Sequence, residues 1–204
     1  MNPTLRDTLL EEAHQLFQAR GITSLPLEQI MSKLDVSPTT FREMFHDKED
    51  LVLQVTQHDI ERQKREHAEL FQSTPNAVGR LLSLLEMGIR DLRKVTSPDY
   101  FADLIRDYPQ AWDLGQQHLA EYSYPQIHNL LNEGILQKTL RADINITLVS
   151  KIIIEQLYMV LNEQTFPPSR YDVAEVFRSV YLYYMRGLCT EEGLKSASAY
   201  FSRM

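Results

Sequence analysis

Residues 27–45 read LEQIMSKLDVSPTTFREMF, and this stretch decides the fold. Apolar residues recur at helical spacing on both sides of a short break at residues 35–37, which indicates two short helices. Asp35 tolerates a left-handed backbone, Ser37 is a good N-cap, and Pro38 suits the first helical position. Two short helices joined in this way form a helix-turn-helix, a unit whose second helix can enter the major groove of DNA.

The second of these helices has one polar and one apolar face. Its outer face carries Pro38, Thr39, Arg42 and Glu43. Phe41 and Phe45 lie four residues apart and are expected to face inward. The same spacing also fits an ordinary three-helix packing unit with no role in DNA binding, so spacing alone leaves both interpretations open.

The flanking sequence completes a three-helix domain. Thr4 and Asp7 have the spacing of a capping box, and the helix that they open ends at Gly21. A long helix from about Lys48 to Phe71 follows the helix-turn-helix.

The rest of the chain also has helical periodicity. One helix is expected to begin at Pro75, and others to run from Ser97–Pro98 to Tyr108, from Pro109 to about Gln137 with a kink near Pro125, over 144–162, and over 171–188. The last two are apolar nearly all round, so each needs two burial partners. We predict an all-α protein, with an N-terminal helix-turn-helix three-helix domain (residues 1–48) followed by a larger helical effector-binding and dimerisation domain (residues 49–204).

Composition excludes several classes of protein. The 204 residues are 43% hydrophobic and include one cysteine, Cys189, which rules out an intramolecular disulfide framework. No apolar run is long enough to span a membrane, and the N-terminus lacks a secretory signal, so we expect a cytoplasmic protein. The net charge of −7 argues against a nonspecific nucleic-acid binder.

No catalytic or metal-binding motif is present. None of the six histidines has another histidine three or four residues away, and no phosphate loop, HExxH or GxSxG occurs. We therefore predict that the chain is not an enzyme and needs neither a metal nor a cofactor.

Residues 6–51 resemble the N-terminal domain of the TetR/AcrR family of transcriptional regulators. The resemblance rests on two stretches and the residue Ile30 between them: Arg6-x-x-Leu9-Leu10-x-x-Ala13-x-x-Leu16-Phe17-x-x-x-Gly21, and Val36-Ser37-x-x-Thr40-Phe41-x-x-x-Phe45-x-x-Lys48-Glu49-x-Leu51. It implies that Thr40 and Lys48 contact backbone phosphates and that Thr39, Arg42 and Glu43 face bases or their flanks. The candidate DNA-binding residues are Ser37, Pro38, Thr39, Thr40, Arg42, Glu43 and Lys48.

The resemblance also implies a ligand pocket and a dimer. Large side chains with a polar group suit an aromatic or drug-like effector, and the candidate lining residues are Met87, Tyr108, Trp112, His118, Tyr122 and Tyr158. Any one of them can equally be a core or surface residue. The helices near 144–162 and 171–188 resemble the homodimer interface of the family, and a dimer would present two headpieces to a palindrome.

Two functions follow from these features. The first is a ligand-responsive homodimeric regulator, a repressor released from a palindromic DNA operator by a small-molecule effector. The second is a helical ligand-binding or protein-interaction module whose headpiece no longer binds DNA. Residues 1–50 motivate this second function, because they contain five Lys and Arg but nine Asp and Glu, which gives a net charge of −4.

Overall fold

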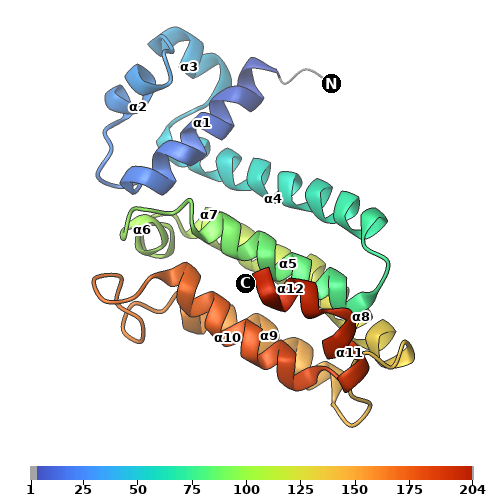
Figure 1. Ribbon diagram of the computed structural model, residues 1–204. Helices are drawn as coiled ribbons and strands as arrows, with labels where there is room; N and C mark the ends of the chain where they lie inside the picture. The colour runs from blue at the N-terminus through green and yellow to red at the C-terminus, as the bar shows by residue number, and fades with distance from the viewer. Residues whose placement is uncertain (1–3, 204) are drawn as a thin grey trace. The chain divides into compact units, whose positions relative to one another are not determined.

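The structure is a computed structural model in which residues 4–203 are described. Its α-helices are α1 (Leu5–Arg20), α2 (Leu27–Lys33), α3 (Pro38–Met44), α4 (Lys48–Ser73), α5 (Ala77–Leu92), α6 (Tyr100–Asp107), α7 (Pro109–His118), α8 (Tyr124–Leu136), α9 (Ile146–Val160), α10 (Val173–Leu188), α11 (Glu191–Ser196) and α12 (Ser198–Arg203). A π-helical turn, η1 (Leu119–Ser123), joins α7 to α8. The described residues form no strand beyond an isolated bridge between Leu140 and Cys189, which confirms the all-α fold class (Figure 1).

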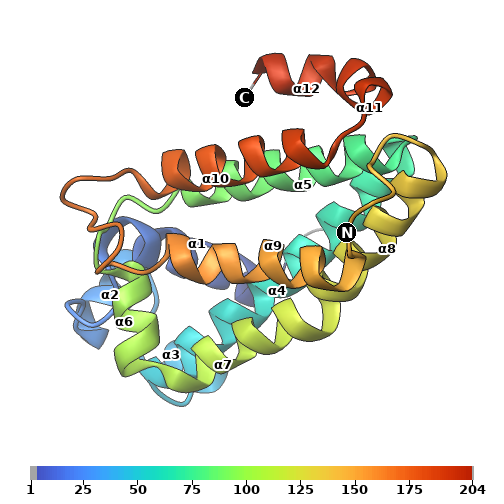
Figure 2. The same ribbon diagram turned by 90° about the horizontal axis from the view of Figure 1, so that it is seen from below.

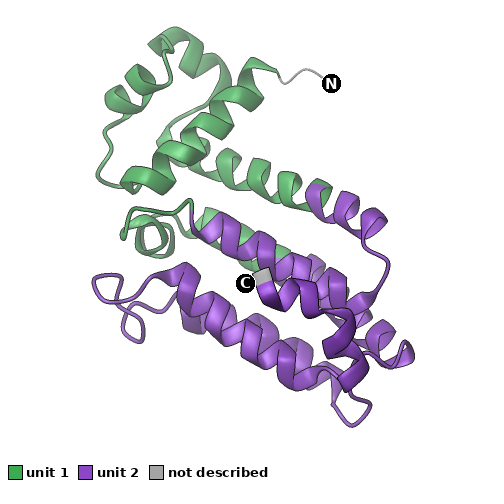
Figure 3. Cartoon of the chain, viewed as in Figure 1, with its two compact units in different colours: residues 1–65, 94–118 green, residues 66–93, 119–204 purple. Residues whose placement is uncertain are grey.

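The chain forms two compact units (Figure 3). Unit 1 consists of residues 1–65 and 94–118, and unit 2 consists of residues 66–93 and 119–204. Unit 1 therefore joins the helix-turn-helix to α6 and α7, which lie far away in the sequence. The predicted boundary at residue 48 separates a helix-turn-helix domain from an effector-binding and dimerisation domain, and it stays a prediction.

The core of unit 1 is built around the first four helices. Phe17, Phe41 and Phe45 are almost completely buried there, and the two last rings lie 5.1 Å apart, centroid to centroid. Tyr100 and Leu104 from α6 are buried in the same cluster. The helix-turn-helix thus shares its hydrophobic core with a later part of the chain.

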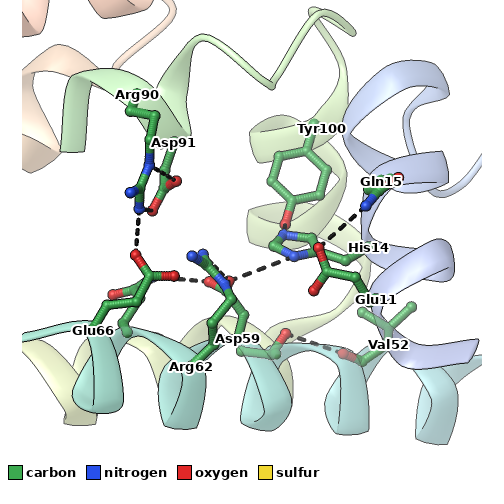
Figure 4. Close-up of polar contacts among 12 residues, drawn as sticks. Glu11, His14, Gln15, Val52, Asp59, Arg62, Glu66, Arg90, Asp91 and Tyr100 are labelled. Atoms are coloured by element: carbon green, nitrogen blue, oxygen red, sulfur yellow. Dashed lines mark hydrogen bonds and ion pairs between the residues drawn. The ribbon is translucent and has the colours of Figure 1, made fainter. Parts of the chain in front are cut away.

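A buried polar chain also joins three helices of unit 1 (Figure 4). His14 of α1 has its Nδ1 3.5 Å from a carboxylate oxygen of Asp59 in α4 and its Nε2 3.2 Å from the hydroxyl of Tyr100 in α6. Burial lowers the pKa of His14 because desolvation disfavours the imidazolium, and this outweighs the opposing effect of the Asp59 carboxylate.

The core of unit 2 is formed by four long helices. Helix α5 packs against α8 and α10, and α9 packs against the same two helices (Figure 2). Leu82, Leu131 and Val160 are among its fully buried side chains. The predicted kink near Pro125 takes the form of the π-helical turn η1, which immediately precedes the first turn of α8.

Candidate nucleic-acid interface

The turn between α2 and α3 has the backbone that the sequence predicts. Asp35 has a φ of 51°, in the left-handed region that aspartate tolerates better than most residues. The Val36 amide donates to the carbonyl of Met31 at 3.0 Å, which closes the turn. The chain can therefore change direction within three residues and begin α3 at Pro38.

Ser37 and Thr40 fix the start of α3. The Thr40 amide donates to Ser37 Oγ at 3.0 Å, so Ser37 is the N-cap of the helix. The two hydroxyls also lie within hydrogen-bonding distance of each other, at 2.8 Å. Ser37 is exposed and Thr40 is half-buried. Both hydroxyls thus lie beside the N-terminus of α3, where backbone amides favour an anion.

The exposed face of α3 carries the remaining candidate base-reading groups. Pro38, Thr39, Arg42 and Glu43 are all exposed, whereas Phe41 is buried on the opposite face. Within the described residues, the Arg42 guanidinium takes part in no hydrogen bond or ion pair. Its five N–H donors are available to a guanine edge or a phosphate.

Lys48 lies at the start of α4 and points into its own unit. Its Nζ donates to the carbonyl oxygens of Ile22 and Leu25, both at 2.7 Å, and lies 5.9 Å from the ring centroid of Tyr108. Burial lowers the pKa of Lys48, with Asp103 and Asp107 opposing that change. The phosphate contact that the family resemblance implies for this residue stays a prediction.

Three acids of the headpiece serve as helix caps. Asp7 closes a capping box with Thr4, as predicted. Asp47 Oδ1 accepts from the Asp50 amide at 2.8 Å, and Asp50 Oδ2 accepts from the His46 amide at the same distance. Part of the negative charge of the headpiece is therefore held at helix N-termini, where the helix dipole favours it.

The six candidate effector-binding residues are divided between the two units. Met87, Tyr122 and Tyr158 belong to unit 2, and Tyr108, Trp112 and His118 belong to unit 1. Tyr108 is buried in the core of unit 1, which is the environment of a packing residue. The Tyr122 ring stacks on His67 at 5.9 Å and 15°. That the six line a common effector site stays a prediction.

Three polar residues stand out in the structure that sequence reasoning missed or left without a role. Asp103 of α6 is buried and binds the backbone between α1 and α2. Gln126 and Gln156 each have a buried side-chain oxygen with no hydrogen-bond partner among the described residues. A signal for the glutamines was present, because each occupies the apolar stripe of its helix, four residues before a buried leucine or valine (Leu130 and Val160).

The described residues hold no group of three His, Cys, Asp or Glu arranged to bind a metal ion. In the same part of the chain, no helix combines the length and apolarity needed to cross a membrane.

Comparison with known proteins gives two results. Residues 9–55 match the family model described as bacterial regulatory proteins of the tetR family. The matched region contains the helix-turn-helix and the start of α4. Curated protein sequences gave no match.

Solved structures of regulators share the fold over most of the chain. A TetR-family transcriptional regulator from Agrobacterium tumefaciens superposes with a TM-score of 0.70 at 16% identity, covering 91% of this chain and 98% of that one. A transcriptional regulator from Saccharomonospora viridis, solved with choline, gives 0.69 at 18% identity over 91% and 98%. The fatty acid degradation regulator FadR from Bacillus halodurans gives 0.66 at 17% identity over 92% and 98%. The N-terminal helix-turn-helix domain therefore matches the tetR family of bacterial regulatory proteins, and the chain has the fold of solved TetR-family regulators.

Proposed function

We propose that this regulator is a homodimeric repressor that binds a palindromic operator and is released from it by a small-molecule effector. The observation that carries the proposal is the exposed polar face of α3, on a headpiece that matches the family model. Arg42 projects from this face without an internal partner among the described residues. An unpaired guanidinium on a recognition helix is suited to reading a guanine through its O6 and N7 atoms.

Selection of bound duplexes from a random library tests DNA binding directly. We expect an enriched palindrome from the purified protein at low salt. On that sequence, Arg42→Ala should weaken binding by about 1–3 kcal/mol and relax the preference at one base pair of each half-site. Lys195→Ala is the matched control, because it removes one exposed positive charge from outside the headpiece. An equal loss on every sequence would make Arg42 a phosphate contact instead.

Exposed apolar side chains on α9 and α10 support the dimer. Leu148 and Met159 on α9 are 54% and 40% exposed, and Tyr183 on α10 is 64% exposed. Leu148 and Met159 are eleven residues apart, so both lie on one face of α9. An unpartnered apolar face on adjacent helices is suited to self-association about a two-fold axis.

Light scattering on variants tests the interface. Leu148→Glu and Tyr183→Glu should each shift the protein from dimer to monomer, because a buried carboxylate without a partner is costly. Leu5→Glu changes an equally exposed leucine of unit 1 and should leave the dimer intact. Dimers that survive both interface substitutions would rule out this surface.

Polar groups in unit 2 support an effector with hydrogen-bond donors. The buried Gln126 and Gln156 oxygens lack donors, and Gln126 follows Tyr122 by one helical turn. Similar folds include the regulator solved with choline, whose hydroxyl is a hydrogen-bond donor, so choline is a reasonable first probe. A probe that raises the Tm and releases the selected duplex would identify an effector. The six predicted lining residues then become targets for substitution.

The acidic headpiece favours the second candidate, a module that has lost DNA binding. Salt dependence separates the two functions. A repressor must show a negative slope of log affinity against log salt concentration, because phosphate contacts release counterions. A folded dimer that enriches no sequence and binds no duplex at low salt would support the alternative.

A further inference from the structure

The backbone between α1 and α2 forms a tight turn, and this turn sets the direction in which α2 begins. Gly21 has a φ of 75°, in the left-handed region that favours glycine. The Leu25 amide then donates to the carbonyl of Ile22 at 3.1 Å. Helix α2 begins two residues later, and its N-cap, Pro26, makes no side-chain capping hydrogen bond. The direction of α2 therefore depends on how the turn itself is held.

Two side chains of opposite charge hold this turn. Asp103 Oδ2 accepts from the amides of Ile22 and Thr23 at 2.7 and 2.8 Å. Lys48 Nζ donates to the carbonyls of Ile22 and Leu25 at 2.7 Å, and a longer contact of 3.4 Å reaches the Thr23 carbonyl. The carboxylate binds the donors of the turn and the ammonium binds its acceptors, so every strong contact acts on the same four-residue segment.

This use of Lys48 competes with the phosphate contact that the family resemblance implies. An ammonium has three N–H donors, and two of them form short bonds within unit 1. The side chain is half-buried and lies over the Tyr108 ring. Burial also lowers its pKa, as expected for an ammonium partly removed from water. A phosphate would have to displace these carbonyls from Nζ, or else accept from the third N–H, which makes only the 3.4 Å contact to the Thr23 carbonyl.

We propose that Lys48 is a positioning residue: together with Asp103 it clamps the turn at residues 21–25, and it supports DNA binding by orienting α2 and α3 and not by contacting a phosphate. The clamp itself does not depend on the proposed function. Its effect on DNA affinity does rest on that function. The test therefore has one arm without DNA and one arm with it.

The arm without DNA compares lysine variants by thermal unfolding. Lys48→Met should lower the Tm by about 5 °C, because it removes both short bonds to the turn. Lys48→Arg should lower it comparably, because a planar guanidinium does not reproduce the contacts of a compact ammonium. Lys33→Met, at an exposed lysine of α2, is the matched control and should leave the Tm unchanged. An unchanged Tm for Lys48→Met would overturn the clamp, whether or not the protein binds DNA.

The arm with DNA uses a duplex of about 30 base pairs that carries the selected palindrome, titrated at several salt concentrations. We expect Lys48→Met and Lys48→Arg both to weaken binding about tenfold while the salt slope stays at the wild-type value. A phosphate contact predicts the opposite pattern: Lys48→Arg would keep its affinity, and the slope of Lys48→Met would become less negative by about one. That pattern would overturn the positioning role. Wild-type protein that binds no duplex would refute the proposed function, and the clamp would then be decided by the Tm values alone.

Discussion

Asp103→Ala should be among the most damaging single substitutions in unit 1. The Asp103 side chain is only 5% exposed, and its Oδ2 is the acceptor for two backbone amides, those of Ile22 and Thr23. Ile22 has no exposed surface, so water cannot replace the carboxylate at its amide. The remaining partner, Arg106, is 62% exposed and adds little.

The magnitude follows from the two amides. A hydrogen bond to a charged acceptor contributes about 1.5–3 kcal/mol, and a buried donor left unpaired costs about as much. Two such bonds give an expected loss of about 3–5 kcal/mol in the free energy of unfolding. For a chain of this size, that corresponds to a fall in Tm of roughly 10 °C. Asp103→Asn keeps one oxygen as an acceptor and should lose about half as much.

Urea denaturation followed by circular dichroism measures the change, and amide hydrogen exchange locates it. The Ile22 and Thr23 amides should lose protection in Asp103→Ala. Asp107→Ala is the matched control, because Asp107 lies one turn later in α6 but is exposed, with Thr23 Oγ1 and Arg106 as its partners. A loss below about 1 kcal/mol, or one equal to that of the control, would refute the reasoning.

Three further predictions concern other parts of the chain. Gly193→Ala should destabilise the protein by about 2–4 kcal/mol in urea, because an added Cβ would lie 2.0 Å from the Thr139 carbonyl oxygen; Gly115→Ala, whose Cβ would meet nothing within 4 Å, should instead stabilise its helix by about 0.5–1 kcal/mol. The unfolded chain protonates His14 more readily than the native state, whose His14 pKa is lowered by burial, so stability should fall as the pH drops below 6.5. His14→Gln should lose that part of the pH dependence when urea midpoints at about pH 7.5 and about pH 5.5 are compared, and an identical dependence would contradict the assignment. Burial raises the pKa of the Cys189 thiol to about 11, so iodoacetamide should alkylate it far more slowly in native protein than in guanidinium chloride; equal rates would show an accessible thiolate.

Local features of the fold were predictable from the sequence because their causes are local. The caps formed by Thr4 and Ser37 are confirmed, and so is the left-handed backbone at Asp35. Each depends on residues within four positions along the chain. Helix ends were less well predicted: α5 begins at Ala77 with Asn76 as its cap, not at Pro75. Asn76 Oδ1 accepts from the Gly79 amide at 2.7 Å, and this cap sets the start of the helix two residues after Pro75.

Contacts between distant segments were not predictable. Asp103 belongs to no recognisable local motif, yet it binds amides 80 or more residues away. Nothing in its own neighbourhood indicates that partner. The placement of Lys48 has the same cause, since its carbonyl partners belong to a turn that precedes it by more than twenty residues. Family resemblance identified the position but could not show which atoms of this chain bind its ammonium.

The discontinuous construction of unit 1 has a consequence for protein synthesis. Its N-terminal segment leaves the ribosome first, but Tyr100, Leu104 and Tyr108 of the same core are translated only after residues 66–93 have been made. A nascent chain that ends at residue 65 therefore exposes the apolar surface that these side chains later cover. We expect such a chain to need chaperone protection and to bind no operator until residue 118 has emerged. A regulator built in this way cannot act on DNA before residues 94–118 have been synthesised.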